Sequence, residues 1–95
     1  MKIFISYTRR DNELTESDFR KIQGLINHKY HIFIHFFNPK INSQEEIESE
    51  VLNSDILILI KTKESFLSKW VLTELKTAQS ANIPIFYITI NDLRY

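Results

Sequence analysis

The chain has 95 residues, 43% of them hydrophobic, which is the length and composition of one globular domain. Its 12 Lys and Arg residues balance 12 Asp and Glu residues, so no overall charge favours binding to nucleic acid or to an acidic membrane. The absence of Cys excludes disulfides, a thiolate zinc site and a Cys nucleophile. No apolar run has the length of a signal-peptide core or a membrane span, and a cytoplasmic location is the default expectation.

Four short runs rich in Ile and Phe predict strands, and segments with helical spacing of apolar residues lie between them. In chain order we expect strands over residues 2–7, 31–37, 55–61 and 83–90, alternating with helices over residues 12–29, 43–53 and 64–82. The second helix opens with the capping box Ser43-Gln44-Glu45-Glu46. The last two strands are almost continuous in apolar residues, which is typical of parallel strands covered by helices on both faces.

This order of elements predicts an α/β fold: a flavodoxin-like, doubly wound parallel sheet with four strands and three helices, in a single domain spanning residues 1–95. The terminal strand–helix unit that usually completes such a sheet is missing after the fourth predicted strand. We therefore expect one open edge and one thinly covered face, either in a fragment of a longer protein or in a domain that covers itself by self-association.

Glu74 is an acid within the apolar face of the last predicted helix. At 100° per residue that face carries Leu67, Trp70, Val71, Leu75, Ala78 and Ala81. An ionised acid in this position requires a partner, a shifted pKa or a cleft that reaches water. Two explanations stay open: a structural acid bonded to the backbone or to Arg9 or Arg10, and a functional group in a binding cleft.

A ligand site is expected beyond the carboxyl ends of the strands, where open α/β sheets bind their ligands. The first strand leads to Thr8-Arg9-Arg10-Asp11, and the second leads to Phe37-Asn38. Arg suits planar, bidentate contact with phosphate, so an anionic nucleotide is a chemically sensible ligand.

Several of these residues also have simpler explanations. Arg9 and Arg10 can form a solvated turn, Asp11 can cap the first helix, and Trp70 can pack in the core, which we favour for Trp70. A metal site is not expected, because His28, His31 and His35 lack ligand spacing.

Three segments of the chain resemble the Toll/interleukin-1 receptor (TIR) domain family. Ile3-Phe4-Ile5-Ser6-Tyr7, with a polar turn ending in Asp11, is similar to the family's opening motif, and residues 54–60 are similar to its third strand. The segment from Ser68 to Leu75 is similar to its S-x-W-x-x-x-E-L helix. The match covers nearly the whole chain in the right order, and it indicates a short TIR domain of the bacterial type.

Many members of this family cleave NAD at the nicotinamide–ribose bond, in signalling or defence. The resemblance implies that Glu74 is the catalytic residue, that NAD is a substrate rather than a cofactor, and that residues 37–43 form a mobile gate and assembly surface. The substrate-binding residues that we expect are Tyr7, Thr8, Arg9, Arg10, Asp11, Phe37, Asn38, Ser68 and Trp70. The implied partners are NAD or a related nucleotide and other TIR domains, in a homo-oligomer.

Two alternatives to the enzyme remain. One is a non-catalytic TIR interaction module that works by homotypic self-association. The weaker one is a phosphoacceptor receiver, which the sequence disfavours because Asp55 precedes the apolar run of its strand instead of following it.

Overall fold

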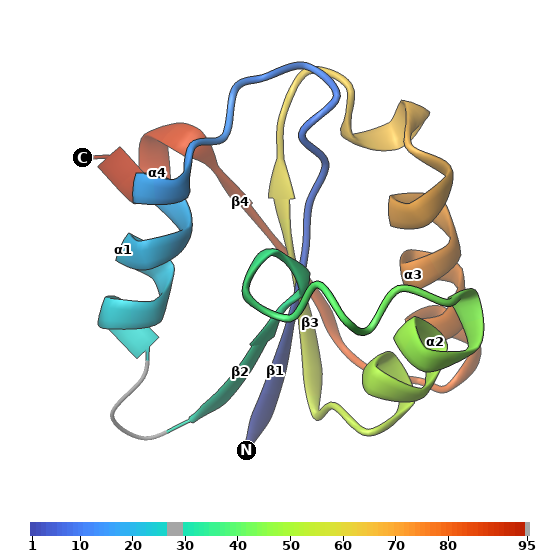
Figure 1. Ribbon diagram of the computed structural model, residues 1–95. Helices are drawn as coiled ribbons and strands as arrows, with labels where there is room; N and C mark the ends of the chain where they lie inside the picture. Colours follow the sequence, from blue (N-terminus) through green and yellow to red (C-terminus); the bar gives the residue numbers. More distant parts are fainter. Residues whose placement is uncertain (27–29, 95) are drawn as a thin grey trace.

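A parallel four-stranded sheet lies between two layers of helices in the computed structural model, which describes residues 1–26 and 30–94 (Figure 1). The elements in chain order are β1 (Lys2–Ser6), α1 (Glu16–Ile26), β2 (His31–Ile34), the 3-10 turn η1 (His35–Phe37), α2 (Gln44–Leu52), β3 (Ile56–Lys61), the 3-10 turn η2 (Ser65–Leu67), α3 (Lys69–Ser80), β4 (Ile85–Thr89) and α4 (Ile90–Arg94). The strand order is β2-β1-β3-β4, and all three pairings are parallel. The predicted flavodoxin-like α/β fold is confirmed.

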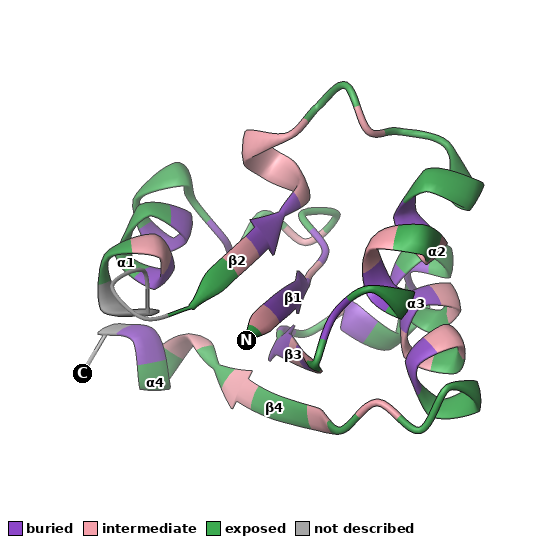
Figure 2. Ribbon diagram, turned by 90° about the horizontal axis from the view of Figure 1, so that it is seen from below, coloured by how far each residue is buried: buried purple, intermediate pink, exposed green. Residues whose placement is uncertain are grey.

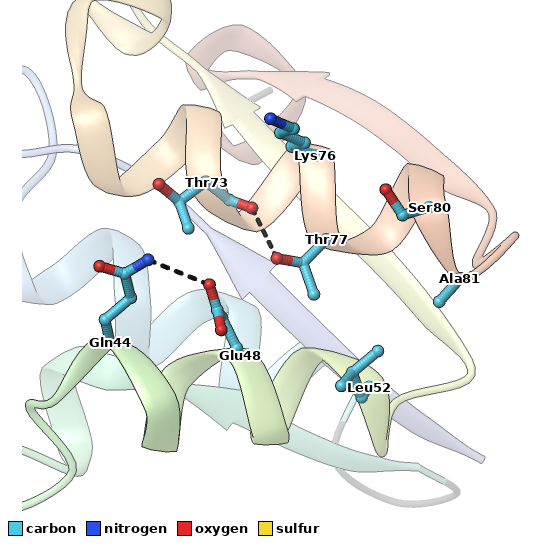
Figure 3. A pocket seen from close by; sticks show the side chains of 8 residues that line it. All are labelled: Gln44, Glu48, Leu52, Thr73, Lys76, Thr77, Ser80 and Ala81. Atoms are coloured by element: carbon cyan, nitrogen blue, oxygen red, sulfur yellow. Dashed lines mark hydrogen bonds between the residues drawn. The ribbon is translucent and has the colours of Figure 1, made fainter.

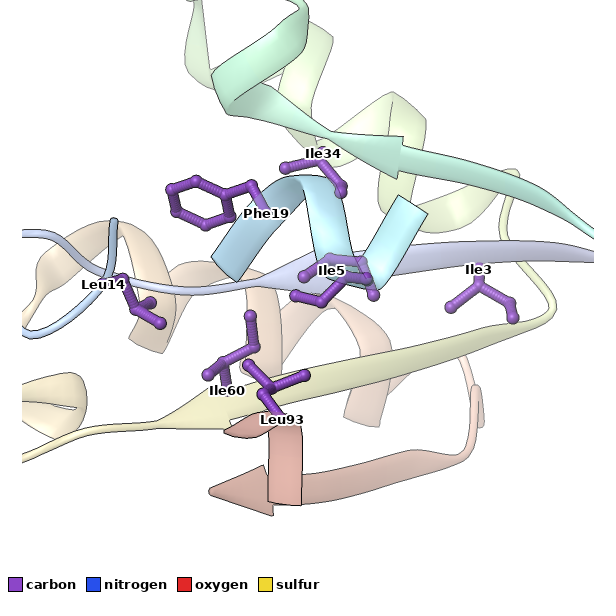
Figure 4. Packing of buried hydrophobic residues seen from close by; sticks show 8 residues of the cluster. Ile3, Ile5, Leu14, Phe19, Ile34, Ile60 and Leu93 are labelled. Atoms are coloured by element: carbon purple, nitrogen blue, oxygen red, sulfur yellow. The ribbon is translucent and has the colours of Figure 1, made fainter. Parts of the chain in front are cut away.

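The two faces of the sheet carry separate cores, because successive side chains of a strand point to opposite sides. On one face, residues of β1, β2 and β3 pack against α1, α4 and the loop before α1 (Figure 4); the buried members are Ile3, Ile5, Leu14, Phe19, Ile22, Ile34, Ile60 and Leu93. On the other face the sheet packs against α2 and α3; the buried members are Phe4, Phe33, Ile47, Val51, Leu57, Leu59, Val71 and Ala78. The strands in the middle of the sheet are thus covered on both sides.

The edge strand β4 is less covered than its apolar sequence predicts. Figure 2 shows β4 in the colours of exposed and intermediate residues, with no buried segment. Phe86 is 53% exposed and Tyr87 is 56% exposed. Phe86 and Tyr87 are successive residues and point to opposite faces of the sheet, so neither face of β4 is fully covered. The expectation that this strand is buried on both faces is therefore wrong.

Local hydrogen bonds place several element ends away from their predicted positions. α1 begins at Glu16 rather than at residue 12, because Thr15 and Asp18 cap it reciprocally: the Thr15 backbone N donates to Asp18 Oδ2 (2.9 Å), and the Asp18 backbone N donates to Thr15 Oγ1 (3.3 Å). β2 ends at Ile34, where the chain enters η1. The short helix α4, which the sequence did not predict, follows β4 directly. The predicted end of α1, residues 27–29, lies outside the described residues.

Ser43 caps α2 as predicted, but of the two capping-box bonds only the one from the Glu46 backbone N is formed among the described hydrogen bonds. Ser43 Oγ accepts a hydrogen bond from the Glu46 backbone N (3.1 Å) and donates to Glu46 Oε1 (2.9 Å). This cap fixes the start of α2 at Gln44, on the sheet face that α2 shares with α3.

Candidate functional site

A pocket of about 420 Å³ opens at the carboxyl ends of β1 and β2, on the face covered by α2 and α3. Its lining consists of Ile5, Tyr7, Thr8, Arg9, His35, Asn42, Ile47, Ser68, Trp70 and Glu74. The sheet changes winding direction at β1, since β2 lies on one side of β1 and β3 on the other. Such a switch point is where open α/β sheets bind ligands, and the volume is in the range of small-molecule sites.

Glu74 is the buried acid of this pocket. It lies on the inner face of α3, whose first turn is capped by Ser68: the Ser68 Oγ accepts from the Val71 backbone N (3.3 Å). Glu74 is 7% exposed, and its Oε1 accepts a hydrogen bond of 2.7 Å from the Oγ of Ser6, the fully buried last residue of β1. It forms no ion pair with any of residues 1–26 or 30–94.

Neither proposed structural partner of Glu74 forms an ion pair with it. The Arg10 Nε lies 3.3 Å from Glu64 Oε1, and its Nη1 donates to the Leu67 carbonyl (3.1 Å). The Arg9 guanidinium lies over the ring of Phe36, 5.1 Å from its centroid. The explanation of Glu74 as an acid paired with Arg9 or Arg10 is therefore wrong.

Burial raises the pKa of Glu74 to about 7, although the hydrogen bond from Ser6 acts in the opposite direction. Burial also raises the pKa of the neighbouring Tyr7 to about 12, and the negative charge of Glu74 adds to that rise, while the backbone of Phe36 and the charge of Arg9 lower it. Glu74 is consequently poised to exchange a proton near neutral pH or to stabilise a nearby positive charge, whereas Tyr7 stays protonated.

Arg9 and Trp70 form the exposed rim of the pocket. Arg9 makes no ion pair with the described residues, so its guanidinium is available to an anion. Trp70 is 47% exposed, which corrects the favoured placement of this ring in the core. Leu67, expected on the same buried face, is also exposed, because it lies in η2 before α3 begins.

Comparison with protein families decides the classification. A family model described as "TIR domain" matches residues 3–94, from β1 to α4. The chain belongs to the TIR domain family. The resemblance found in the sequence is thus confirmed, while comparisons with curated proteins and with solved structures gave no match.

Four residues expected at the site of this TIR domain do not line its pocket: Arg10, Asp11, Phe37 and Asn38. Asp11 joins the loop after β1 to the loop after β3, since its Oδ2 accepts from Thr62 Oγ1 (2.7 Å) and from the Glu64 backbone N (2.8 Å). The expectation that Asp11 caps α1 is therefore wrong, because Thr15 and Asp18 cap that helix. Burial raises the pKa of Asp11, but the hydrogen bonds that it accepts from Thr62 and from the backbone outweigh burial and lower it.

Phe37 and Asn38 stabilise the turn that follows β2. The ring of Phe37 packs edge-on against Phe36, 5.2 Å between centroids, and lies under the guanidinium of Arg20. Asn38 Nδ2 donates to the Ile34 carbonyl (2.8 Å) and closes the turn. Both residues hold the pocket wall in place rather than lining it.

The TIR domain pocket also includes four residues that were not among the expected substrate-binding residues, of which Asn42 lies within the expected gate of residues 37–43: Ile5, His35, Asn42 and Ile47. His35 is the first residue after β2 and so satisfies the rule that selected Phe37 and Asn38. It was missed because the strand was expected to continue to residue 37. Asn42 and Ile47 come from the loop before α2 and from α2 itself, and no local pattern distinguishes them.

A second hollow of the TIR domain, about 490 Å³, lies along the outer surfaces of α2 and α3 (Figure 3). None of its eight lining residues is buried. Its drawn hydrogen bonds connect neighbouring turns of one helix, from Gln44 to Glu48 and from Thr77 to the Thr73 carbonyl. It is a groove between helix surfaces, and it lacks the buried acid of the first pocket.

Residues 1–26 and 30–94 contain no group of three or more His, Asp or Glu side chains that could hold a metal ion. Within the same residues, no helix is long and apolar enough to cross a membrane.

Proposed function

We propose that this TIR domain binds NAD or a related nucleotide and hydrolyses the nicotinamide–ribose bond, in a signalling or defence context. The observation that carries the proposal is Glu74: a buried acid without an ion pair among the described residues, in a pocket at the switch point of the sheet. A structural acid at this depth would normally be paired, because burial of an unpaired charge is costly. Pockets that keep such a group are the ones that use it.

The chemistry suits a single carboxylate. When nicotinamide leaves, it takes the electrons of the glycosidic bond, and positive charge develops at C1′ of the ribose. The carboxylate of Glu74 stabilises that charge from close range, and the apolar surroundings strengthen the interaction. Water then forms the new bond to C1′ and releases its proton, giving ADP-ribose and free nicotinamide.

The remaining lining supports a dinucleotide as the ligand. The free guanidinium of Arg9 suits the diphosphate, and the exposed indole of Trp70 offers a face for stacking. Thr8 contributes a hydroxyl whose Oγ1 already accepts from the Arg10 backbone N (3.3 Å), which leaves its O–H free to donate.

Nicotinamide release from NAD tests the proposal, measured over a series of protein concentrations because family members assemble. Glu74→Gln preserves side-chain shape and removes the charge. Glu45→Gln makes the same chemical change on the exposed face of α2 and serves as the matched control. We expect release by the wild type and by Glu45→Gln, and none by Glu74→Gln. Equal rates for the wild type and Glu74→Gln would contradict the assignment.

A second candidate is a TIR interaction module without catalysis, favoured by the exposed Phe86 and Tyr87 on the open edge strand β4. It predicts self-association that Tyr87→Lys weakens, that a change at the exposed Pro39 in the loop before α2 also weakens, and that Glu74→Gln leaves unchanged. Light scattering over a concentration series measures this. A monomer at all concentrations, together with NAD turnover, would contradict the second candidate.

A further inference from the structure

His35 brings an imidazole to the pocket that the proposed chemistry does not use. It is the first residue of η1, directly after β2, and it is half-buried. It lines the same pocket as Glu74, from the β2 side of the sheet rather than from α3. Its neighbours in the chain, Ile34 and Phe36, are both apolar.

The Nε2 atom of His35 is buried without a hydrogen-bond partner. Among residues 1–26 and 30–94, it is the one buried side-chain nitrogen or oxygen in this condition. Nearly all buried polar atoms in native proteins are paired, so an exception needs an explanation. A Phe in this position would keep the ring's packing and avoid the cost of the unpaired nitrogen.

The position of the exception suggests what satisfies it. Destabilising groups are retained at functional sites, where they gain their partner from the ligand. The nitrogen belongs to a residue that lines the pocket. In the proposed function, Arg9 binds the diphosphate of a dinucleotide and Glu74 stabilises the positive charge at C1′, so the charged groups of the ligand already have partners. An imidazole nitrogen donates or accepts one hydrogen bond, which suits an uncharged hydroxyl.

We propose that His35 is a positioning residue of this pocket: when the nucleotide binds, the His35 ring turns so that Nε2, which has almost no accessible surface in this structure, hydrogen-bonds a ribose hydroxyl and orients the ribose toward Glu74. This inference rests on the proposed function, because it takes the nucleotide as the ligand. It adds a contact from a second wall of the pocket, so that η1 and α3 hold the ribose between them.

The inference requires stability and ligand affinity to change in opposite directions. His35→Phe removes the unpaired nitrogen and keeps a ring, so the folded protein should melt at a higher temperature. The same change removes the hydrogen bond to the ribose, so affinity should fall by roughly tenfold. A purely structural histidine would not give this combination, because its loss would lower the melting temperature or leave the affinity unchanged.

The experiment measures melting temperature and calorimetric binding of ADP-ribose, which keeps the ribose hydroxyls and lacks nicotinamide. The variants are His35→Phe, His35→Gln, whose amide reaches about the position of Nε2, and the control His31→Phe at the exposed start of β2. We expect His35→Phe to melt higher and bind more weakly, His35→Gln to regain affinity, and His31→Phe to bind like the wild type.

Two results would overturn the inference while leaving the proposed function intact: ADP-ribose affinity unchanged in His35→Phe, or a lower melting temperature for that variant. A wild type that neither binds ADP-ribose nor consumes NAD would contradict the proposed function itself, and the role of His35 with it. The wild-type measurements therefore separate the two failures.

Discussion

Replacing Glu74 with Gln should make the folded protein more stable at pH 8 and leave its stability almost unchanged at pH 4. The pKa of Glu74 is about 7 in the folded protein, compared with its ordinary value of 4.5. The folded state therefore holds the proton more tightly than the unfolded state does. Above pH 4.5 the unfolded state releases this proton more readily, so stability falls as pH rises, until the folded carboxyl has also ionised above pH 7.

The size of this loss follows from the two pKa values. Each pKa unit corresponds to about 1.4 kcal/mol, so ionising Glu74 at its 7% exposed position costs about 3 kcal/mol of folding free energy at pH 8. Gln has the same shape and no charge, and its Oε1 can still accept from Ser6. The free energy of unfolding of Glu74→Gln should exceed that of the wild type by about this amount at pH 8.

Urea unfolding of both proteins at half-unit steps between pH 4 and pH 8 measures the difference directly. Other titrating groups are the same in the two proteins and cancel, and Glu45→Gln on the surface of α2 controls for the loss of a charge. A difference that is constant across the range, or that grows toward acid pH, would refute the reasoning about burial of Glu74.

Three further changes test the surroundings of Glu74. Ser6→Ala removes the hydrogen bond that opposes burial, so the pKa of Glu74 should rise and the pH transition of its stability difference should move to higher pH; an unchanged transition would contradict the role of Ser6. Asp11→Asn should lower stability by about 1 kcal/mol at pH 7 in urea unfolding. Because the pKa of Asp11 is lowered on folding, this loss should vanish as pH falls below about 4, and a loss that persists at low pH would count against it. Trp70→Ala should lower the free energy of unfolding by well under the roughly 3–5 kcal/mol that loss of a buried Trp costs, and it should raise the KM for NAD. A large drop in melting temperature would instead indicate that Trp70 packs in the core.

The fold could be predicted because its signals are local. Apolar strands and helical spacing specify the order of elements, and strand alternation sends Ile3 and Ile5 to one face and Phe4 to the other. The placement of Glu74 on the inner face of α3 follows from the same periodicity. Each of these depends on residues a few positions apart.

The rest depends on partners that are distant in the chain. Asp11 accepts a hydrogen bond from Thr62, which lies 51 positions away in the chain. No sequence pattern near Asp11 predicts that bond. Trp70 has the spacing of a core residue, but helical periodicity does not say where the covering sheet ends. Phe37 does not line the pocket for a simpler reason: β2 ends at Ile34, three residues before its predicted end, so His35 occupies the position after the strand.

The central claim is that the Glu74 carboxylate is catalytic, and the most direct measurement is nicotinamide release from NAD at pH 7 by the wild type and by Glu74→Gln, with both proteins shown to be folded by their melting curves. The account predicts release by the wild type and none by the variant, although the variant is the more stable protein. Release by the variant at the wild-type rate would contradict it.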